Sequence, residues 1–429
     1  MLIRVVDYVG NLGGGVRFVL ETMQALSRLH PEAEFELVSH GAALERYRAL
    51  AQAKGLVLNL TEAKPDNYWW ATALRIRALR GSVGLARLLG FGASFHYVVP
   101  EHILDNCDVL WFPWIHRHRL AKPATAPVVG SLHDTIHVHF ENIIPKRHRA
   151  DERETLHQWL ASAARIVASS NGADERETLH QWLASAARIV VSSNATVATV
   201  TKSFQVSPER FSVIPVSGEH AKASTVGELP SSWDWSMKPF LICPSNVAPH
   251  KNHEVLLEGV AAWGAKYPLV LTGEGADLLP PELGRRTGTI RRLAKAKGFE
   301  IGSSLIPLGY VSNEAYFGLL SRSWALIMPT LAEGGGSFPV YEAMMHGVPV
   351  VCSDIPVIRE QILRTGGEVM WFNPHDPLDL AEKLNELEGD YQNHKERAKM
   401  YAGELNHRSW EDVASEYWSI FVSVAKGAG

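Results

Sequence analysis

The sequence predicts an α/β protein with two domains, each built on a parallel sheet. Short apolar stretches of strand length alternate with helical stretches, and this alternation occurs twice along the chain. A polar segment at residues 217–238, rich in Ser, Gly and Pro, separates the two runs and is predicted to be the linker. The length of 429 residues is sufficient for two hydrophobic cores.

The first domain is predicted to span residues 1–216. It begins with a strand at Met1–Asp7, a loop containing Gly13, Gly14 and Gly15, and a helix at Val16–Leu29. Glycines let the backbone approach a ligand closely, and this loop follows the carboxyl end of a strand, where open α/β sheets bind ligands. Further strands are predicted at Phe35–Ser39, Val109–Phe112, Val128–Leu132, Arg188–Ser192 and Phe211–Pro215.

The second domain is predicted to span residues 239–408. A helix is expected from Glu254 to about Trp263, and another from Trp410 to about Ala425 in the closing segment 409–429. Strands are predicted at Phe240–Cys243, Leu269–Thr272, Ser304–Leu308, Trp324–Met328, Val348–Cys352 and Val369–Phe372.

A tandem duplication lies in the first domain, within residues 150–194. Ala150–Asn171 recurs as Ala173–Asn194 with one difference, Ala168 against Val191. The second copy leads directly into the next predicted helix, so the first copy is interpreted as an inserted segment. Two copies are too few for a solenoid. A recent duplication, a functional repeat and an assembly artefact all remain open.

The composition is that of an ordinary globular enzyme. Apolar residues make up 46% and charged residues 21% of the chain, and the net charge of −4 argues against a nucleic-acid partner. Cys107, Cys243 and Cys352 lack paired spacing, which favours core thiols in a cytoplasmic protein over disulfides or a metal site. Neither a signal peptide nor an uncharged run long enough to span a bilayer is recognised.

The most informative segment lies at residues 329–351. A strand leads into Glu333 and a run of three glycines, and a helix is predicted to open at Ser337, Phe338 and Pro339. Pro suits the first helical turn, Ser can cap it, and the free N–H groups of a helix start attract phosphate. With Glu333 and Glu342 flanking the loop, the segment suits a polyhydroxylated ligand that carries a diphosphate.

This segment resembles the donor-site signature of retaining glycosyltransferases with the GT-B fold, specifically glycosyltransferase family 4. The stretch from Glu342 through Gly347 to Val350 matches the second half of that signature. The family spaces its two glutamates by seven residues, whereas eight separate Glu333 from Glu342, which indicates a one-residue insertion in the glycine turn. The resemblance implies two Rossmann-like domains facing each other across a cleft, with the closing helix returning to the first domain.

The resemblance also implies how the second domain holds the donor. Lys251, in a Lys-Asn element before a helix, would hold the phosphates, and Asn246 stands where the family usually has an arginine. Glu342 would bind the ribose hydroxyls, with an exposed helix glutamate as the alternative. Glu333 would bind the sugar hydroxyls, with a loop carboxylate shifted away from the site as the alternative. The remaining donor-binding residues implied are Gly273 near the nucleobase, and Gly335, Gly336, Ser337 and Phe338 near the phosphates.

In the first domain the resemblance points to four more positions. Gly14 and Gly15 would face the donor phosphates and the acceptor, and His133 would touch the transferred sugar as a catalytic residue. The alternative for His133 is a purely structural histidine. Asp134 could orient the imidazole of His133 or act on the acceptor. No Asp-x-Asp pair or recognisable ligand spacing is present, so no metal and no cofactor are expected.

Residues 67–100 contain no acidic side chain but hold several arginines, among them Arg75 and Arg77, close to Tyr68, Trp69 and Trp70. A basic, aromatic helix is expected here. It would contact a phosphorylated lipid acceptor or the inner face of the membrane, unless it is simply a half-buried helix with solvated arginines.

Taken together, the resemblance implies transfer of a sugar from a nucleotide diphosphate sugar to a saccharide or lipid-linked acceptor, in polysaccharide, lipopolysaccharide or glycolipid assembly. A non-catalytic sugar-nucleotide-binding subunit is the alternative, supported by Asn246 and the altered glutamate spacing. A nicotinamide oxidoreductase is disfavoured because Phe18 occupies the place of the third glycine in Gly-x-Gly-x-x-Gly.

Overall fold

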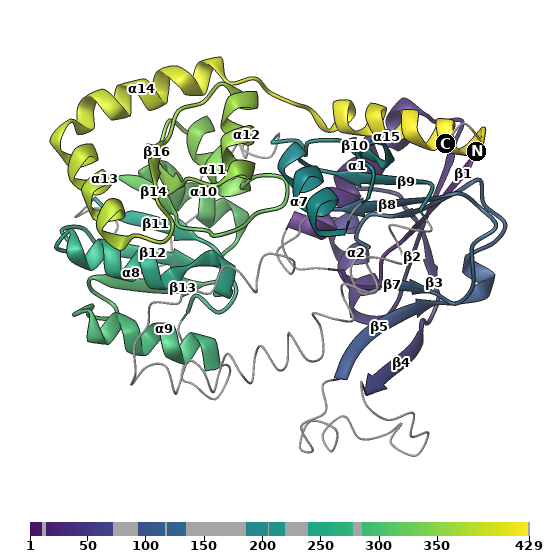
Figure 1. Ribbon diagram of the computed structural model, residues 1–429, viewed down its shortest axis with the longest axis horizontal. Helices are drawn as coiled ribbons and strands as arrows, with labels where there is room; N and C mark the ends of the chain where they lie inside the picture. Colours follow the sequence, from purple (N-terminus) through teal and green to yellow (C-terminus); the bar gives the residue numbers. More distant parts are fainter. Residues whose placement is uncertain are drawn as a thin grey trace. The chain divides into compact units, whose positions relative to one another are not determined.

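The computed structural model describes residues 1–10, 14–71, 93–115, 118–133, 186–204, 206–218, 239–277 and 285–427. The chain divides into two compact units (Figure 1). Among the described residues, unit 1 contains 1–216 and 409–427, and unit 2 contains 217–408. Both are α/β units with parallel sheets, as the sequence predicts.

Unit 1 is built on a seven-stranded sheet in the order β10-β9-β8-β6-β1-β2-β3, in which every neighbouring pair is parallel. The strands are β1 (Leu2–Val6), β2 (Glu34–Ser39), β3 (Asn59–Glu62), β6 (Val109–Phe112), β8 (Val128–Leu132), β9 (Arg188–Val191) and β10 (Phe211–Val213). From β1 the chain adds β2 and β3 on one side, and it then crosses back to add β6, β8, β9 and β10 on the other side. The topological switch point therefore lies between β1 and β6, where such sheets bind ligands.

The described helices of unit 1 cover the two faces of this sheet. They are α1 (Gly14–Leu29), α2 (Gly41–Ala53), α7 (Asn194–Phe204) and α15 (Trp410–Ala425), with short 3₁₀ turns η2 (Glu101–Ile103) and η4 (Pro208–Arg210). Helix α15 packs against α1, and its Trp410, Tyr417 and Phe421 are buried in the same core as Trp111 of β6. A capping box between Ser409 and Asp412 begins α15.

A small third sheet corrects one prediction. Residues 67–100 were expected to form a basic, aromatic helix, but β4 (Asp66–Ala71) pairs antiparallel with β5 (Ala93–Val99), and β5 pairs with β7 (His118–Leu120). The aromatic and β-branched residues at both ends of this segment have high strand propensity, and Trp69 lies opposite Phe95 in the register. The arginines between the two strands lie outside the described residues.

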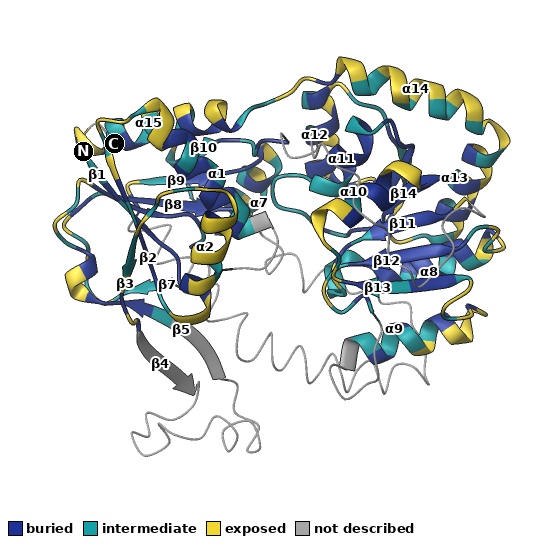
Figure 2. Cartoon of the chain, turned by 180° about the vertical axis from the view of Figure 1, so that it is seen from behind, coloured by how far each residue is buried: buried dark blue, intermediate teal, exposed yellow. Residues whose placement is uncertain are grey.

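Unit 2 is built on a six-stranded parallel sheet in the order β13-β12-β11-β14-β15-β16. The strands are β11 (Leu241–Pro244), β12 (Leu269–Thr272), β13 (Leu305–Gly309), β14 (Ala325–Met328), β15 (Val350–Ser353) and β16 (Met370–Phe372). Here the switch point falls between β11 and β14. The first three residues of β11 and all four of β14 are buried, and both strands appear dark blue in Figure 2.

The helices of unit 2 fill the crossovers between these strands. They are α8 (His253–Ala262), α9 (Arg285–Ala296), α10 (Asn313–Arg322), α11 (Phe338–Met345), α12 (Pro356–Thr365), α13 (Pro377–Gly389) and α14 (Tyr391–Glu404), with the 3₁₀ turn η6 (Pro249–Lys251) before α8. The outward faces of α13 and α14 are exposed, as the yellow parts in Figure 2 show. None of the described helices combines the length and apolar character that a membrane span requires.

The two ends of unit 2 are bound to each other. The Ser217 hydroxyl donates a hydrogen bond to the Arg408 carbonyl at 2.6 Å. Next to this bond, Tyr341 Oη lies 2.9 Å from His407 Nδ1, and a Cβ atom added to Gly218 would lie 2.0 Å from the Tyr341 ring. Only glycine therefore fits at position 218, and both ends of the unit contact α11.

The duplicated block lies mostly outside the described residues. The part that is described is the end of the second copy, which forms β9 and leads into α7.

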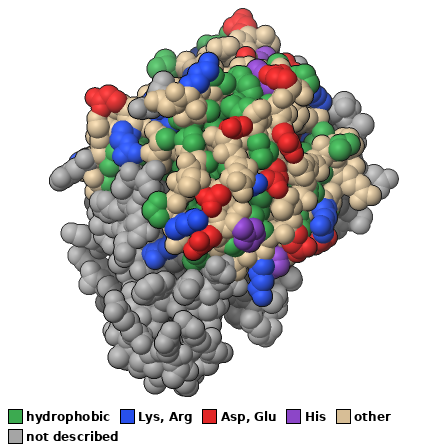
Figure 3. Space-filling view, turned by 90° about the vertical axis from the view of Figure 1, so that its right-hand side faces the viewer, with side chains coloured by type: hydrophobic (Ala, Val, Ile, Leu, Met, Phe, Trp, Pro, Cys, Tyr) green, Lys and Arg blue, Asp and Glu red, His purple; other side chains and the backbone are tan. Residues whose placement is uncertain are grey.

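The face drawn in Figure 3 carries interspersed acidic and basic side chains wherever it is described. Charges of both signs alternate there over short distances, which gives this face no basic stripe of the kind that follows a nucleic-acid backbone.

Candidate functional site

The predicted donor residues of unit 2 gather at one edge of its sheet. The loop after β11 carries Asn246 and Lys251, the turn after β12 carries Gly273, and the loop after β14 carries Glu333. Because β11 lies between β12 and β14 and all three are parallel, these loops leave the carboxyl edge side by side at the switch point.

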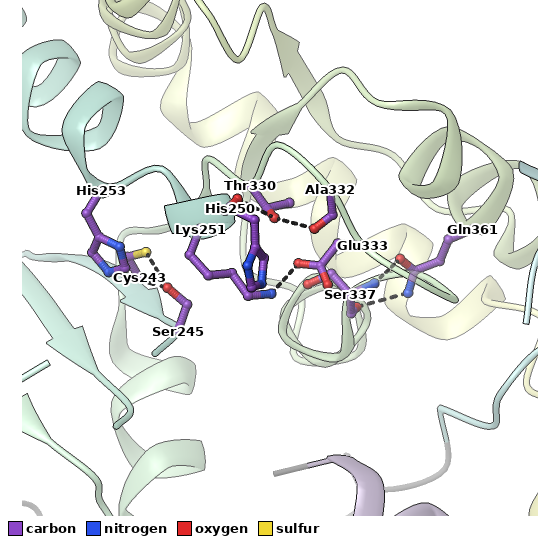
Figure 4. Close-up of polar contacts among 10 residues, drawn as sticks. All are labelled: Cys243, Ser245, His250, Lys251, His253, Thr330, Ala332, Glu333, Ser337 and Gln361. Carbon is purple, nitrogen blue, oxygen red and sulfur yellow. Dashed lines mark hydrogen bonds and ion pairs between the residues drawn. The ribbon is translucent and has the colours of Figure 1, made fainter. Parts of the chain in front are cut away.

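Lys251 and Glu333 form an ion pair at this edge. Lys251 Nζ lies 2.5 Å from Glu333 Oε1, and only 17% and 11% of the two side chains are exposed (Figure 4). Backbone contacts bring their loops together, since the Leu331 N–H donates to the His250 carbonyl at 2.7 Å. The structure thus places a lysine and a carboxylate from distant parts of the sequence in direct contact.

Asn252 fixes the loop that carries Lys251. It has a left-handed backbone with φ of 55°, which asparagine tolerates better than most residues. Its buried side-chain amide donates to the carbonyls of Pro329 at 3.0 Å and Pro374 at 2.8 Å. One side chain therefore connects the loops that follow β11, β14 and β16.

The glycine loop meets α12 at a single buried amide. The Ser337 N–H donates to Gln361 Oε1 at 2.7 Å, and Gln361 Nε2 donates back to the Ser337 carbonyl at 3.0 Å (Figure 4). Ser337 was predicted to cap α11 with its hydroxyl. It does occupy the N-cap position, but its side chain makes no capping hydrogen bond.

The Ser337 hydroxyl is nevertheless buried beside the glycine loop. Ser337 is 3% exposed, and its Oγ makes no hydrogen bond to the part of the chain that the structure describes. A buried hydroxyl without a partner costs free energy, so this atom is suited to bind a ligand. Helix α11 begins at the next residue, and Pro339 is in its first turn.

Glu342 lies on α11 and is 5% exposed. Its Oε2 accepts a hydrogen bond from the hydroxyl of Tyr316, on α10, at 2.8 Å. Burial and the adjacent carboxylate raise the pKa of Tyr316 well above its usual value, so the phenol keeps its proton and remains a donor. Glu342 is thus an oriented, buried carboxylate.

Gly273 makes the closest backbone approach at this edge. Its φ is +122°, and an added Cβ atom would lie 2.7 Å from the Ser245 carbonyl. Asn246, beside Ser245, is exposed. Gly335 and Gly336 are partly buried, Phe338 begins α11, and Gly336 has a φ of +111° that favours glycine.

The predicted residues of unit 1 lie at the carboxyl edge of its own sheet. Gly14 and Gly15 form the start of α1 after β1, and His133 follows β8. His133 Nδ1 lies 2.9 Å from Ser192 Oγ, and the ring stacks on Trp114 with centroids 5.3 Å apart and meets the edge of Phe18 at 4.4 Å. Ser192 after β9, Trp114 after β6 and Phe18 of α1 thus hold this imidazole in place.

Three predicted acceptor residues, Asp134, Arg75 and Arg77, lie outside the described residues, as does Gly13. Within the described ranges, no group of three or more His, Cys, Asp or Glu side chains is arranged to hold a metal ion.

Sequence reasoning missed Tyr316 and Gln361. Each lies far from its partner in the sequence, at separations of 26 and 24 residues, and on a different element. The one signal in the sequence for Gln361 was its spacing from Ile358 and Ile362, which places a polar side chain on the apolar face of this helix.

Residues 228–404 match the family described as Glycosyl transferases group 1. Similar curated proteins include the serotype-specific mannosyltransferase WbdA of Escherichia coli, 28% identical over 211 residues, which is 48% of this chain and 24% of WbdA. The O-antigen chain mannosyltransferase RfbU of Salmonella typhimurium is 28% identical over 140 residues, 33% of this chain and 36% of RfbU. The chain thus matches about a quarter to a third of the length of these relatives.

Solved structures with the same fold cover the whole chain. HepE of Anabaena, crystallised with UDP and glucose, has a TM-score of 0.60 and 14% identity over 99% of this chain and 100% of that one. TarM of Staphylococcus aureus, a mutant crystallised with UDP among other ligands, has a TM-score of 0.60 and 11% identity over 98% of this chain and 99% of that one. These likenesses establish the GT-B fold.

Proposed function

We propose that this chain, a glycosyltransferase of the GT-B fold with a group 1 domain at residues 228–404, transfers a sugar from a nucleoside diphosphate sugar to an acceptor hydroxyl. The observation that carries the proposal is the Lys251–Glu333 pair at the sheet's switch point, with the buried Glu342 on the helix that follows. These groups supply a cation for phosphate and two carboxylates for hydroxyl groups.

The reaction breaks the bond between the anomeric carbon and the diphosphate and forms one to the acceptor oxygen. The diphosphate leaves with negative charge, which Lys251 and the Ser337 hydroxyl would stabilise. For this, Lys251 must exchange Glu333 for phosphate, and Glu333 then accepts hydrogen bonds from the sugar. We propose retention of the anomeric configuration, with the acceptor proton ending on the released diphosphate, and we place His133 beside the transferred sugar.

The sugar and the pathway are proposed from the relatives. WbdA and RfbU are mannosyltransferases, which makes mannose the first sugar to test, and the name of RfbU assigns it to the O-antigen chain. We therefore propose a saccharide acceptor in polysaccharide or lipopolysaccharide assembly. Contact with a lipid-linked acceptor or with the inner face of the membrane would fall to the segment around Arg75 and Arg77.

A thermal-shift screen of nucleoside diphosphates and their sugars tests the function. Nucleoside diphosphates with one particular base are expected to raise the melting temperature by mass action. At a ligand concentration of a hundred times Kd, the free energy of unfolding should rise by about 2.7 kcal/mol. Transfer with the matching sugar is expected to persist in EDTA, since the proposed site uses a lysine for the phosphates. Loss of transfer in chelator, restored by manganese, would instead show a metal requirement. Binding without transfer or hydrolysis would favour the non-catalytic alternative.

Tyr316→Phe tests the role of Glu342 at the ribose. The variant removes the hydroxyl that orients this carboxylate, and a hydrogen bond to a charged group contributes about 1.5–3 kcal/mol. Affinity for the free nucleoside diphosphate is expected to fall about tenfold by calorimetry. The variant should remain folded in the absence of ligand, with a lower melting temperature because a buried hydrogen bond is lost. Tyr310→Phe is the matched control, because Tyr310 is 77% exposed. Equal affinities for the two variants would remove Tyr316 from the site.

A further inference from the structure

We infer that Gln361 is a positioning residue that holds the glycine loop in its donor-binding conformation. This role rests on the proposed function. It is carried by a feature that the family resemblance does not include: the paired hydrogen bonds between one side-chain amide of α12 and both backbone groups of Ser337.

The two hydrogen bonds fix the orientation of the amide. The Ser337 N–H requires an acceptor and the Ser337 carbonyl requires a donor, so Oε1 must face the first and Nε2 the second. Gln361 is 6% exposed and Ser337 is 3% exposed. Both hydrogen bonds are therefore shielded from water, which makes their loss costly.

The glycine loop packs directly on the same amide. A Cβ atom added to Gly336 would lie 2.6 Å from Gln361 Oε1, and the φ of Gly336 is +111°. Glycine has the largest backbone freedom to lose on ordering, and the loop contains three in succession, Gly334 to Gly336. An external contact is needed to select one conformation of such a loop.

Ser337 lies between the two carboxylates that are proposed to bind the donor. Lys251 of η6 contacts Glu333 before the loop, and Tyr316 of α10 contacts Glu342 after it. Gln361 of α12 supplies the third attachment, at the middle of the segment. Without it, the spacing between Glu333 and Glu342 is no longer fixed, and neither is the direction of the Ser337 hydroxyl.

Two substitutions separate this role from a general packing role. Gln361→Met keeps the length of the side chain and removes both hydrogen bonds. Gln361→Glu can accept from the Ser337 N–H, but an ionised carboxylate cannot donate to the Ser337 carbonyl. A protonated glutamic acid can do both, and burial beside a carbonyl raises the pKa of its carboxyl group. Lower pH should therefore restore the attachment in Gln361→Glu alone.

The experiment measures nucleoside diphosphate affinity by calorimetry over a range of pH. Gln361→Met is expected to bind at least about tenfold more weakly at every pH, because two buried hydrogen bonds are lost. Gln361→Glu is expected to bind weakly at neutral pH and to approach wild-type affinity as the pH falls. Hydrogen exchange at the Ser337 amide should be faster in Gln361→Met than in the wild type. Gln392→Glu, at an exposed position of α14, is the control for added charge.

The outcomes distinguish the two levels of the proposal. If the wild type binds and Gln361→Met binds equally well, the positioning role is wrong and the proposed function stands. The role is also wrong if the pH profile of Gln361→Glu follows that of the wild type. If the wild type binds no nucleoside diphosphate at all, the proposed function fails, and the role at a donor loop fails with it.

Discussion

Lys251→Ala is expected to lower the rate of sugar transfer by about 10²–10³, the effect typical of losing a group that stabilises developing negative charge. The structure adds a second reason for a large effect. Glu333 is 11% exposed, and its Oε1 lies 2.5 Å from the Lys251 ammonium. Removing the lysine leaves the Glu333 carboxylate without this partner, next to the proposed position of the diphosphate. The two anions then repel each other. Steady-state kinetics with the donor varied would measure the loss.

A double variant separates the two contributions. Lys251→Ala combined with Glu333→Gln removes the repulsion but does not restore the cation, so affinity for the free nucleoside diphosphate should recover in part while transfer remains low. Lys295→Ala, at an exposed position of α9, is the matched control. A folded Lys251→Ala enzyme with activity within about threefold of the wild type would be incompatible with the role assigned to Lys251.

Glu342→Gln is expected to weaken nucleoside diphosphate binding about ten- to a hundredfold. A carboxylate that accepts hydrogen bonds from ribose hydroxyls loses charge-assisted bonds of about 1.5–3 kcal/mol when it becomes an amide. The fold should survive, because the Tyr316 hydroxyl can still donate to the amide oxygen. Calorimetry with the free nucleotide measures the effect, and Glu404→Gln, an exposed residue of α14, is the control.

A comparison with inorganic diphosphate separates loss of the ribose contact from loss of local structure. Glu342→Gln should leave the weak binding of inorganic diphosphate unchanged, since that ligand has no ribose. Equal weakening for both ligands would indicate a loss of local structure, and an unchanged Kd for the nucleotide would place the ribose elsewhere.

Local patterns predicted the framework of both units well. The strands Val109–Phe112, Val128–Leu132 and Leu269–Thr272 and the helix Trp410–Ala425 have the predicted bounds. Each is marked by a buried apolar run or by a capping residue, signals contained within a few neighbouring positions. The prediction failed at residues 66–71 and 93–99, because the whole segment was assigned to one helix, although the aromatic and β-branched residues at its two ends favour strands that pair with each other.

The site was predictable only where its chemistry is local in sequence. The motif around Glu342 and the lysine before α8 could be recognised from neighbouring residues. The contact between Lys251 and Glu333 spans 82 positions and follows from the strand order, which places β11 beside β14. The contact of Gln361 could not be predicted, because a glutamine on the apolar face of a helix does not indicate that it will bind a serine backbone 24 positions earlier. The expectation that Ser337 caps α11 with its hydroxyl was wrong for the same reason.

The hydrogen bond between Ser217 and Arg408 has a consequence for how such proteins diversify. A segment whose first and last residues are in contact can be exchanged between chains as a cassette, because the incoming segment can keep its own fold while its two ends meet the same pair of attachment points. Here that cassette contains Lys251, Glu333, Glu342 and the loop between the carboxylates. If these residues bind the donor as proposed, replacing the segment would change donor recognition while leaving the sheet that carries His133 untouched. The steric fit between Gly218 and the ring of Tyr341 lies wholly inside this segment, so it is carried along when the segment is exchanged.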